Sequence, residues 1–337
     1  MKALTKLLLL IFVVGLVLSV VAFFGGLDVI GLRDFFNDAE SYGDQITYTE
    51  NAEITTINID VETRNINIIP TASAELLVMY HVHEKDDWIV EENNGILTIY
   101  QNKELEVFNW FNFKFVPADI ITVYIEIPDA WVVDLDINSD VGNVTIEYGE
   151  LSMSDVNINS ATGNVNLSDL DTDMLNIDLN TGNVHLDRVN VSDDLFVSTD
   201  TGRVSLDTVT ALNVILESNT GSVIVDELTG TALTATSDTG TIEVKNSEIT
   251  NQVDLDTDTG AVKVYLTTGS GYDLSSSTGS VTVTLTSLAD LRYDLQTSTG
   301  DIDIDGDDQG NRHSTSTGSI LLKVRVSTGN ISIRVLD

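Results

Sequence analysis

A Thr-Gly pair followed by alternating apolar and polar residues recurs at nearly even steps through the second half of the chain. Clear copies read TDTGRVSL, SNTGSVIV, SDTGTIEV, TDTGAVKV and SSTGSVTV. The steps between aligned glycines are 18 to 21 residues, except for a last step of eleven. A fixed period of this length is typical of repeat architectures, in which each unit packs only against its neighbours. The aligned glycines are Gly142, Gly163, Gly182, Gly202, Gly221, Gly240, Gly260, Gly279, Gly300, Gly318 and Gly329.

The residues around each glycine predict two short strands joined by a corner. Val204 and Leu206 follow Gly202 at two and four residues, and Leu195 and Val197 precede it at seven and five. This period of two indicates strands with one buried face. Because the two inward sets are an odd number of residues apart, a continuous strand would place them on opposite faces. The chain must therefore turn at the x-Thr-Gly motif, and glycine suits the turn because it adopts positive φ at little cost.

About twenty residues per unit, with two or more strands and tight corners, predict an all-β parallel β-solenoid. Successive coils would stack about 4.8 Å apart and bury continuous ladders of aliphatic side chains. Pro128 is the last proline, so no proline interrupts the backbone hydrogen bonds of the repeats. A β-propeller is the main alternative, although its blades usually need roughly 40–50 residues. Serial hairpins are a second alternative.

The N-terminus carries an apolar run from Leu7 to Phe24, preceded by Lys2 and Lys6. Eighteen helical residues span about 27 Å, close to the hydrocarbon thickness of a bilayer. We therefore expect residues 1–28 to form a cytoplasmic tip and one transmembrane helix, with the remainder outside the cytoplasm. A cleaved signal peptide is the alternative. Either way the main body is predicted to be extracytoplasmic; the first interpretation makes it a single-pass protein of the cell membrane.

The rest of the chain divides into three further predicted regions. Residues 29–52 are polar and acidic and predict a linker, residues 53–136 predict a β-rich cap, and residues 137–337 hold the repeats. One aromatic segment in the cap region is a candidate contact with a membrane or a partner protein; a loop folded over the cap is the alternative. Its aromatic residues are Phe108, Trp110, Phe111, Phe113 and Phe115.

Charge and residue types exclude several functions. The chain has 53 acidic and 16 basic residues and a net charge of -37, which argues against nucleic-acid binding. It lacks cysteine, so disulfides and thiolate chemistry are excluded. Asp200 and Asp258 precede their glycines by two residues, but Asn219 and Ser277 fill the same place in other repeats. This interchange favours turn chemistry over proton transfer, so no catalytic or cofactor-binding residue is predicted.

Metal binding is predicted only in a loose form. Asp254, Asp256 and Asp258 alternate along one predicted strand, and further aspartates crowd residues 301–308. Carboxylates of this kind suit Ca²⁺, but the glycine-rich repeat of calcium-bound β-rolls is missing. We expect nonspecific Ca²⁺ binding and leave any specific metal site unknown. His81 and His83 could share a strand face, but no third ligand accompanies them.

Strings such as TDTGRVSL, SDTGTIEV and STGDIDI, following VYIEIPDA and one apolar N-terminal run, resemble the bacterial putative-adhesin family of β-strand repeat proteins. The resemblance covers about residues 53–337. It implies a domain of unknown function without catalytic residues, and some members are membrane-anchored and associated with envelope stress. The expected function is a noncatalytic, adhesin-like binding or scaffold module whose partner is an unknown envelope protein or glycan. Alternatives are a β-helix enzyme acting on extracellular or cell-wall glycan, and regulation of a membrane sensor through the anchor.

Overall fold

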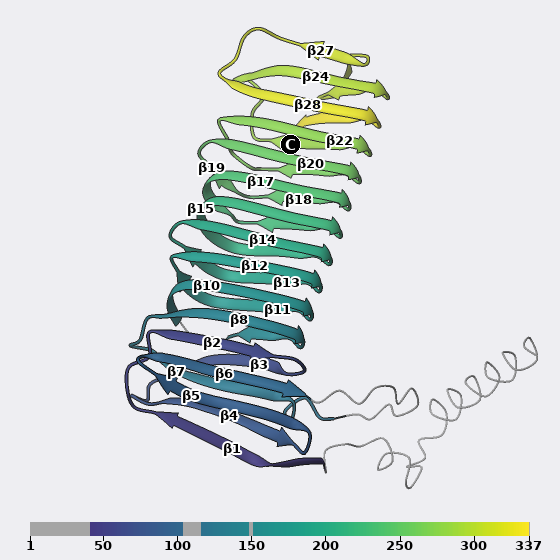
Figure 1. The fold of residues 1–337 in the computed structure, drawn as a ribbon. Coiled ribbons are helices and arrows are strands. Elements are labelled where there is room, and N and C mark those ends of the chain that lie inside the picture. Colours follow the sequence, from purple (N-terminus) through teal and green to yellow (C-terminus); the bar gives the residue numbers. More distant parts are fainter. Residues whose placement is uncertain (1–40, 104–115, 148–150, 337) are drawn as a thin grey trace, which may run out of the picture.

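The computed structural model describes residues 41–103, 116–147 and 151–336. These residues form a long rod of stacked β-strand coils that runs from the purple to the yellow end of Figure 1. The prediction of an all-β fold is confirmed, and the coils make a β-solenoid-like stack. The predicted transmembrane segment and the aromatic residues Phe108, Trp110, Phe111, Phe113 and Phe115 lie outside the described residues. Within the described residues, the structure contains no helix with the length and apolarity to cross a membrane.

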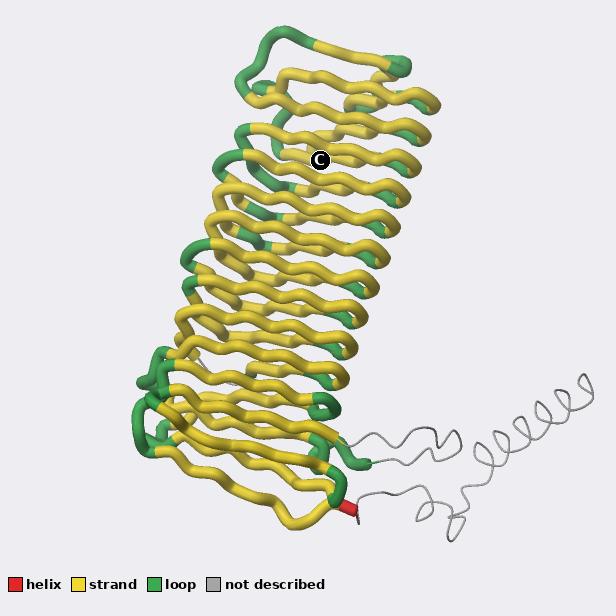
Figure 2. The backbone as a smooth tube through the Cα atoms, in the orientation of Figure 1, coloured by secondary structure: helices red, strands yellow, loops and turns green. Residues whose placement is uncertain are grey.

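Two long faces of the rod are built from strands that lie before and after the glycine corners (Figure 2). The strands before the corners are β8 (Val133–Val141), β10 (Leu151–Thr162), β12 (Met174–Thr181), β14 (Asp194–Thr201), the end of β15 (Val204–Thr220), β17 (Thr229–Thr239), β20 (Gln252–Thr259), β22 (Gly271–Thr278), β24 (Leu291–Thr299) and β28 (Ile320–Thr328). Those after the corners are β9 (Val144–Ile146), β11 (Val165–Thr172), β13 (Val184–Val191), the start of β15, β16 (Val223–Asp226), β18 (Ile242–Lys245), β21 (Val262–Tyr265), β23 (Val281–Leu285), β25 (Ile302–Ile304) and β29 (Ile331–Val335).

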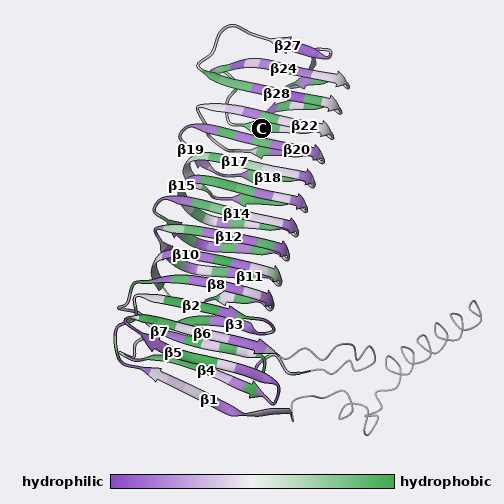
Figure 3. Cartoon of the chain, viewed as in Figure 1, coloured by the Kyte–Doolittle hydropathy of each residue, from purple (hydrophilic) through white to green (hydrophobic). Residues whose placement is uncertain are grey.

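The interior follows the alternation in the sequence. Leu195 pairs in register with Val214, and Val184 with Val204, through parallel ladders between neighbouring coils. These side chains are at most 1% exposed. The smaller Ala235 keeps its place in the ladder beside Leu255. Figure 3 shows hydrophobic and hydrophilic residues alternating along the strands. Because a single coil has no second layer to cover its apolar side chains, the core exists only between stacked coils.

A second bend in each central coil has no glycine and was not predicted. Non-glycine residues take left-handed φ values of 47° to 56° six residues after the corner glycines. They are Asp169, Arg188, Thr208, Glu227, Asn246 and Leu266. A short third side follows each bend and turns a side chain inward, such as that of Leu170, Val189 or Leu228. On one coil this side is a separate strand, β19 (Glu248–Ile249).

The first coil of the chain is not the first coil of the rod. Strand β2 (Thr56–Val61) lies between β6 (Ile96–Lys103) and β8, and β3 (Asn65–Thr71) lies between β7 (Thr122–Pro128) and β9. Antiparallel strands then cover this end of the rod: β4 (Leu76–His83) on β7, β1 (Tyr42–Glu50) on β4, and β5 (Asp86–Asn93) on β6.

The last coil of the chain is likewise inserted. Strand β28 pairs with both β22 and β24, and β29 pairs with both β23 and β25. Two short antiparallel strands, β26 (Asp307–Asp308) and β27 (Arg312–Ser314), lie on β25 and β24. The expectation that each repeat stacks on the one before it therefore holds from β8 to β23 but is wrong for both terminal coils.

Candidate functional site

The corner glycines form a ladder in which successive backbones nearly touch. A Cβ atom added to any of ten corner glycines would lie 1.7–2.1 Å from the carbonyl oxygen of the adjacent corner residue. Real Cβ atoms stay beyond 3.0 Å from such atoms. The order of the ladder is Gly142, Gly163, Gly182, Gly202, Gly221, Gly240, Gly260, Gly279, Gly329 and Gly300. Gly318 lies elsewhere, with its added Cβ against the backbone of Leu291.

Close approach, rather than positive φ alone, explains these glycines. Most of the corner glycines have φ between 142° and 158°, but φ of Gly202 and Gly240 lies outside the +20° to +160° range. Both still have a carbonyl oxygen 1.7 Å from an added Cβ. The physical requirement common to all ten is therefore the missing side chain.

Hydrogen bonds between coils fix the corner on both sides. Six buried hydroxyls, each three residues before a glycine, donate to the corner carbonyl of the adjacent coil at 2.8–3.2 Å. They belong to Thr199, Ser218, Ser237, Thr257, Ser276 and Thr297. On the other side, the carboxamide oxygens of Asn143 and Asn164 each accept a hydrogen bond of 2.9 Å from the next coil's backbone. These bonds satisfy backbone groups at the corner and hold the coils in register.

Beside nine of the ten corner glycines, one column of exposed threonines runs along most of the rod. Nine of them are direct partners in the parallel ladders, in the order Thr162, Thr181, Thr201, Thr220, Thr239, Thr259, Thr278, Thr328 and Thr299. All nine are exposed, and within the described part of the chain their hydroxyls make no side-chain hydrogen bond. We call these nine residues the threonine column. It presents a hydroxyl group at each step of about 4.8 Å.

The aspartates two residues before the glycines stand in the neighbouring exposed column. The Asn219 carboxamide donates to Asp200 Oδ1 at 2.9 Å, and the Ser277 hydroxyl donates to Asp258 Oδ1 at 3.4 Å. Asp140 and Asp238 occupy the same position in their coils. Hydrogen bonding of these carboxylates to neutral neighbours on the adjacent coil is typical of a structural ladder.

The acidic strand β20 and its neighbour β22 bring three carboxylates close together. Asp254 is the register partner of Asp273, and Asp256 lies two residues further along β20. Burial, followed by repulsion from Asp273 and Asp256, raises the pKa of Asp254. In the part of the chain that the structure describes, no group of three or more His, Asp and Glu side chains is arranged to hold a metal ion. His81 Nδ1 lies 2.9 Å from the Gly43 carbonyl oxygen, whereas His83 Nδ1 accepts a hydrogen bond from the Lys85 amide.

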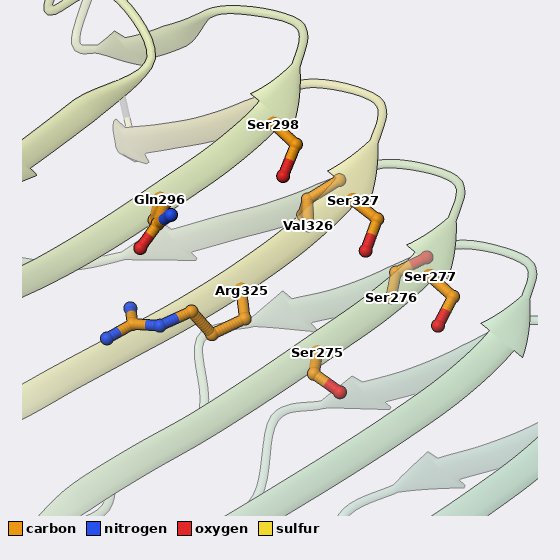
Figure 4. A pocket seen from close by; sticks show the side chains of 8 residues that line it. All are labelled: Ser275, Ser276, Ser277, Gln296, Ser298, Arg325, Val326 and Ser327. Carbon is orange, nitrogen blue, oxygen red and sulfur yellow. The ribbon is translucent and has the colours of Figure 1, made fainter.

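A shallow polar depression of about 290 Å³ lies where the inserted strand β28 meets β22 and β24 (Figure 4). It is lined by Ser275, Ser276, Ser277, Gln296, Ser298, Arg325, Val326 and Ser327. The Arg325 guanidinium donates to Asp294 Oδ2 at 2.5 Å, which balances its charge. A second depression lies on the opposite side of the corner, beside His185, Arg203 and Ser222. Both present hydroxyls and cations that can hydrogen-bond a polar ligand.

Arg64 is a residue whose role the sequence did not reveal. It occupies the corner position below Gly142, whose added Cβ would meet the Arg64 carbonyl oxygen. Its side chain is buried and forms an ion pair with the buried carboxylate of Asp86. The guanidinium also lies 5.2 Å from the ring centre of Tyr42 and 5.7 Å from that of Trp88. The sequence signal for this role was that an arginine occupies the position that glycine holds in the repeats, at the N-terminal end of the series.

Several solved structures are similar to this chain. Among solved structures, a putative adhesin from Bacteroides fragilis is 17% identical, covers 88% of this chain and 99% of its own, and has a TM-score of 0.38. A putative lipid binding protein from Parabacteroides distasonis is 14% identical over 88% of this chain and 98% of its own, with a TM-score of 0.45. A putative cell adhesion protein from Clostridium sporogenes is 12% identical over 87% and 100%, with a TM-score of 0.21.

No curated protein matches the chain. The family model described as Toastrack DUF4097 matches residues 54–334, which is most of the chain and all of its repeats. The resemblance read from the repeats is thereby confirmed, and the chain belongs to the Toastrack DUF4097 family, a family of domains of unknown function.

Proposed function

We propose that this protein is a noncatalytic binding or scaffold module of the cell envelope. In this proposal, residues 1–28 hold it in the cell membrane and the solenoid stands on the extracytoplasmic side. The apolar run Leu7–Phe24, with Lys2 and Lys6 before it, supports the anchor and its orientation. The family resemblance supports an association with envelope stress.

The threonine column is the observation that carries the proposal. It repeats one chemical group in register along nine coils, and every one of these threonines is exposed. A repeated group on a rigid rod can make many weak contacts with an extended partner, and such contacts add through high effective concentration. The partner that fits is therefore long and able to hydrogen-bond, such as an envelope glycan or an envelope protein with repeats of its own.

The test replaces four neighbouring hydroxyls in the column. Valine at Thr201, Thr220, Thr239 and Thr259 keeps the β-branched shape and removes the hydroxyl group. We expect this variant, purified at full length in detergent micelles that cover the proposed anchor, to lose most of its binding to detergent-washed cell-envelope material, measured by co-sedimentation. The matched control carries the same change at four threonines on outward positions of the two faces: Thr234, Thr236, Thr282 and Thr284.

Equal binding by the two variants would contradict the proposal. The same preparations can be incubated with a panel of envelope glycans, because the sequence left open a carbohydrate-active enzyme. Release of a shortened glycan would replace a binding role with a catalytic one. The hydrogen-bonded aspartate column described above favours the binding role.

A further inference from the structure

The C-terminal coil, β28 and β29, fills a slot between two coils that precede it in the chain. Its lower neighbours are β22 and β23, and its upper neighbours are β24 and β25. Each of its strands is thus paired on both edges, although only residues 305–319 connect it to the upper coil. The chain therefore has to return this coil to a place between two coils that precede it in the sequence.

The coils on either side of the slot, β22–β23 and β24–β25, are its two walls, and the C-terminal coil between them is the insert. The two walls could stack directly on each other without the insert. They carry the same inward pattern, with Leu274 in the place of Leu295, and the same Thr-Gly corner. Their corner glycines, Gly279 and Gly300, are 21 residues apart, a step that elsewhere joins directly stacked coils such as those of Gly142 and Gly163. Chain length between the walls is therefore compatible with direct stacking as well as with an open slot.

Charge selects which coil enters the slot. Direct closure would place Asp273 beside Asp294, because both are register partners of Lys323. The insert separates these carboxylates: Lys323 Nζ lies 2.6 Å from Asp273 Oδ2, and Arg325 pairs with Asp294. Among the described strands before the corners, β28 alone carries cations at both of these outward positions. The slot is thus complementary to this particular coil of the chain.

We propose that the slot also accepts the C-terminal coil of a second copy of this chain, so that two molecules can exchange their inserts. The contacts made in exchange are those already present within one molecule, so the complementarity described above applies unchanged. The tether 305–319 is mostly exposed. It pairs with the upper coil through the short strands β26 and β27 and through a few further backbone hydrogen bonds, such as that from the Thr315 amide to the Tyr293 carbonyl. Fully extended, its fifteen residues reach roughly 50 Å, enough to enter a neighbouring rod. This inference does not depend on the proposed function.

Engineered cysteine pairs test the exchange, because the natural chain contains no cysteine. Thr282 on β23 is the register partner of Ser332 on β29, and both side chains point outward. Neighbouring parallel strands bring such positions within the range of a disulfide. Full-length Thr282→Cys and Ser332→Cys chains with different tags are co-expressed, purified under reducing conditions and then oxidised. We expect a disulfide-linked dimer that contains both tags.

The matched control uses the same column where coils stack in chain order. Ser205 and Ile224 are register partners on consecutive coils, so co-expressed Ser205→Cys and Ile224→Cys chains can meet only by random collision. We expect at least tenfold less mixed dimer from this pair. Equal amounts from the two pairs would overturn the exchange. A Thr282→Cys/Ser332→Cys double variant is expected to close within one chain as well; if it forms no disulfide at all, the slot itself is refuted.

Discussion

At the residue scale, the corner glycines illustrate two physical reasons for a glycine: positive φ and the close approach of a neighbouring coil. Positive φ accounts for Gly142 or Gly163 but not for Gly240, whose φ lies outside the left-handed range. What Gly240 shares with the others is the carbonyl oxygen of Gly221, 1.7 Å from where a Cβ would be. That distance follows from stacking, and a sequence read one coil at a time does not contain it.

Gly240→Ala should therefore destabilise the rod although alanine tolerates the local φ. The new methyl group must push two coils apart, and overpacking of this kind costs about 1–3 kcal/mol or more. Gly310→Ala is the control, because Gly310 has φ of 71° and open space around it. That change should lower the free energy of unfolding by only about 1 kcal/mol, because left-handed φ is unfavourable for alanine. Denaturant unfolding measures both; equal losses would mean that close approach is not the cause.

Asp254 should make stability rise as the solution becomes mildly acidic. Its pKa is raised above the ordinary 3.8 in the folded state, so the folded protein binds this proton more readily than the unfolded chain. Its contribution to the free energy of unfolding thus increases as pH falls from neutral through the raised pKa towards 3.8. Asp254→Asn should remove this increase, as seen in unfolding curves at several pH values.

Asp169 is the control, because its contribution to stability should change with pH in the opposite direction. Its hydrogen bond with Arg188 lowers the pKa of the Asp169 carboxyl. Its stabilising contribution is therefore present above pH 3.8 and is lost as pH falls through the lowered pKa. If Asp169→Asn and Asp254→Asn changed the pH profile in the same direction, the assignment of these shifts would be wrong.

At the scale of the element, the N-terminal cap differs from the coils it covers. Ladders of buried aliphatic side chains hold the coils together, whereas a buried polar cluster around Asp86 attaches the cap to the first coil. Besides Arg64, this carboxylate accepts hydrogen bonds from the Trp88 indole and the Gln101 carboxamide, both at 3.2 Å. Gln101 in turn accepts from the Glu62 and Thr63 amides. The cluster ties β5 and β6 to the first corner.

Asp86→Ala should cost about 3–5 kcal/mol, because it leaves the Arg64 guanidinium buried without its counter-charge. Asp187→Ala is the matched change on the rod surface. Asp187 also pairs with an arginine, but Arg188 is 54% exposed, so the loss should stay within about 0–1 kcal/mol. Thermal unfolding of the two variants compares them directly. A small loss for Asp86→Ala would show that the cap does not depend on this pair.

At the scale of the whole molecule, the repulsion within the negative net charge opposes the stacking of the coils. A charge of -37 on one rod repels itself, and the coils bring acidic columns into register. The inserted C-terminal coil offsets this locally by separating two aspartates with a lysine.

Added salt should therefore raise the unfolding temperature. Ionic screening shortens the range of repulsion from about 30 Å at 0.01 M to about 8 Å at 0.15 M, and the extended unfolded chain suffers less from that repulsion. Calorimetry across this range measures the effect, with an uncharged osmolyte as the control for general solvent effects. A constant or falling unfolding temperature would contradict the argument.

The sequence by itself determined the coil: the period, the corners and the buried aliphatics such as Leu195 and Val204. These are local properties, because a two-residue alternation and a glycine report on the strand that contains them. The tertiary structure alone decided which strands and side chains are neighbours. It set the insertion of both terminal coils, the left-handed bends at residues such as Arg188, and the pairing of Arg64 with Asp86. Near-identical repeats can stack in several orders with similar cores, so the order depends on contacts between segments far apart in the chain.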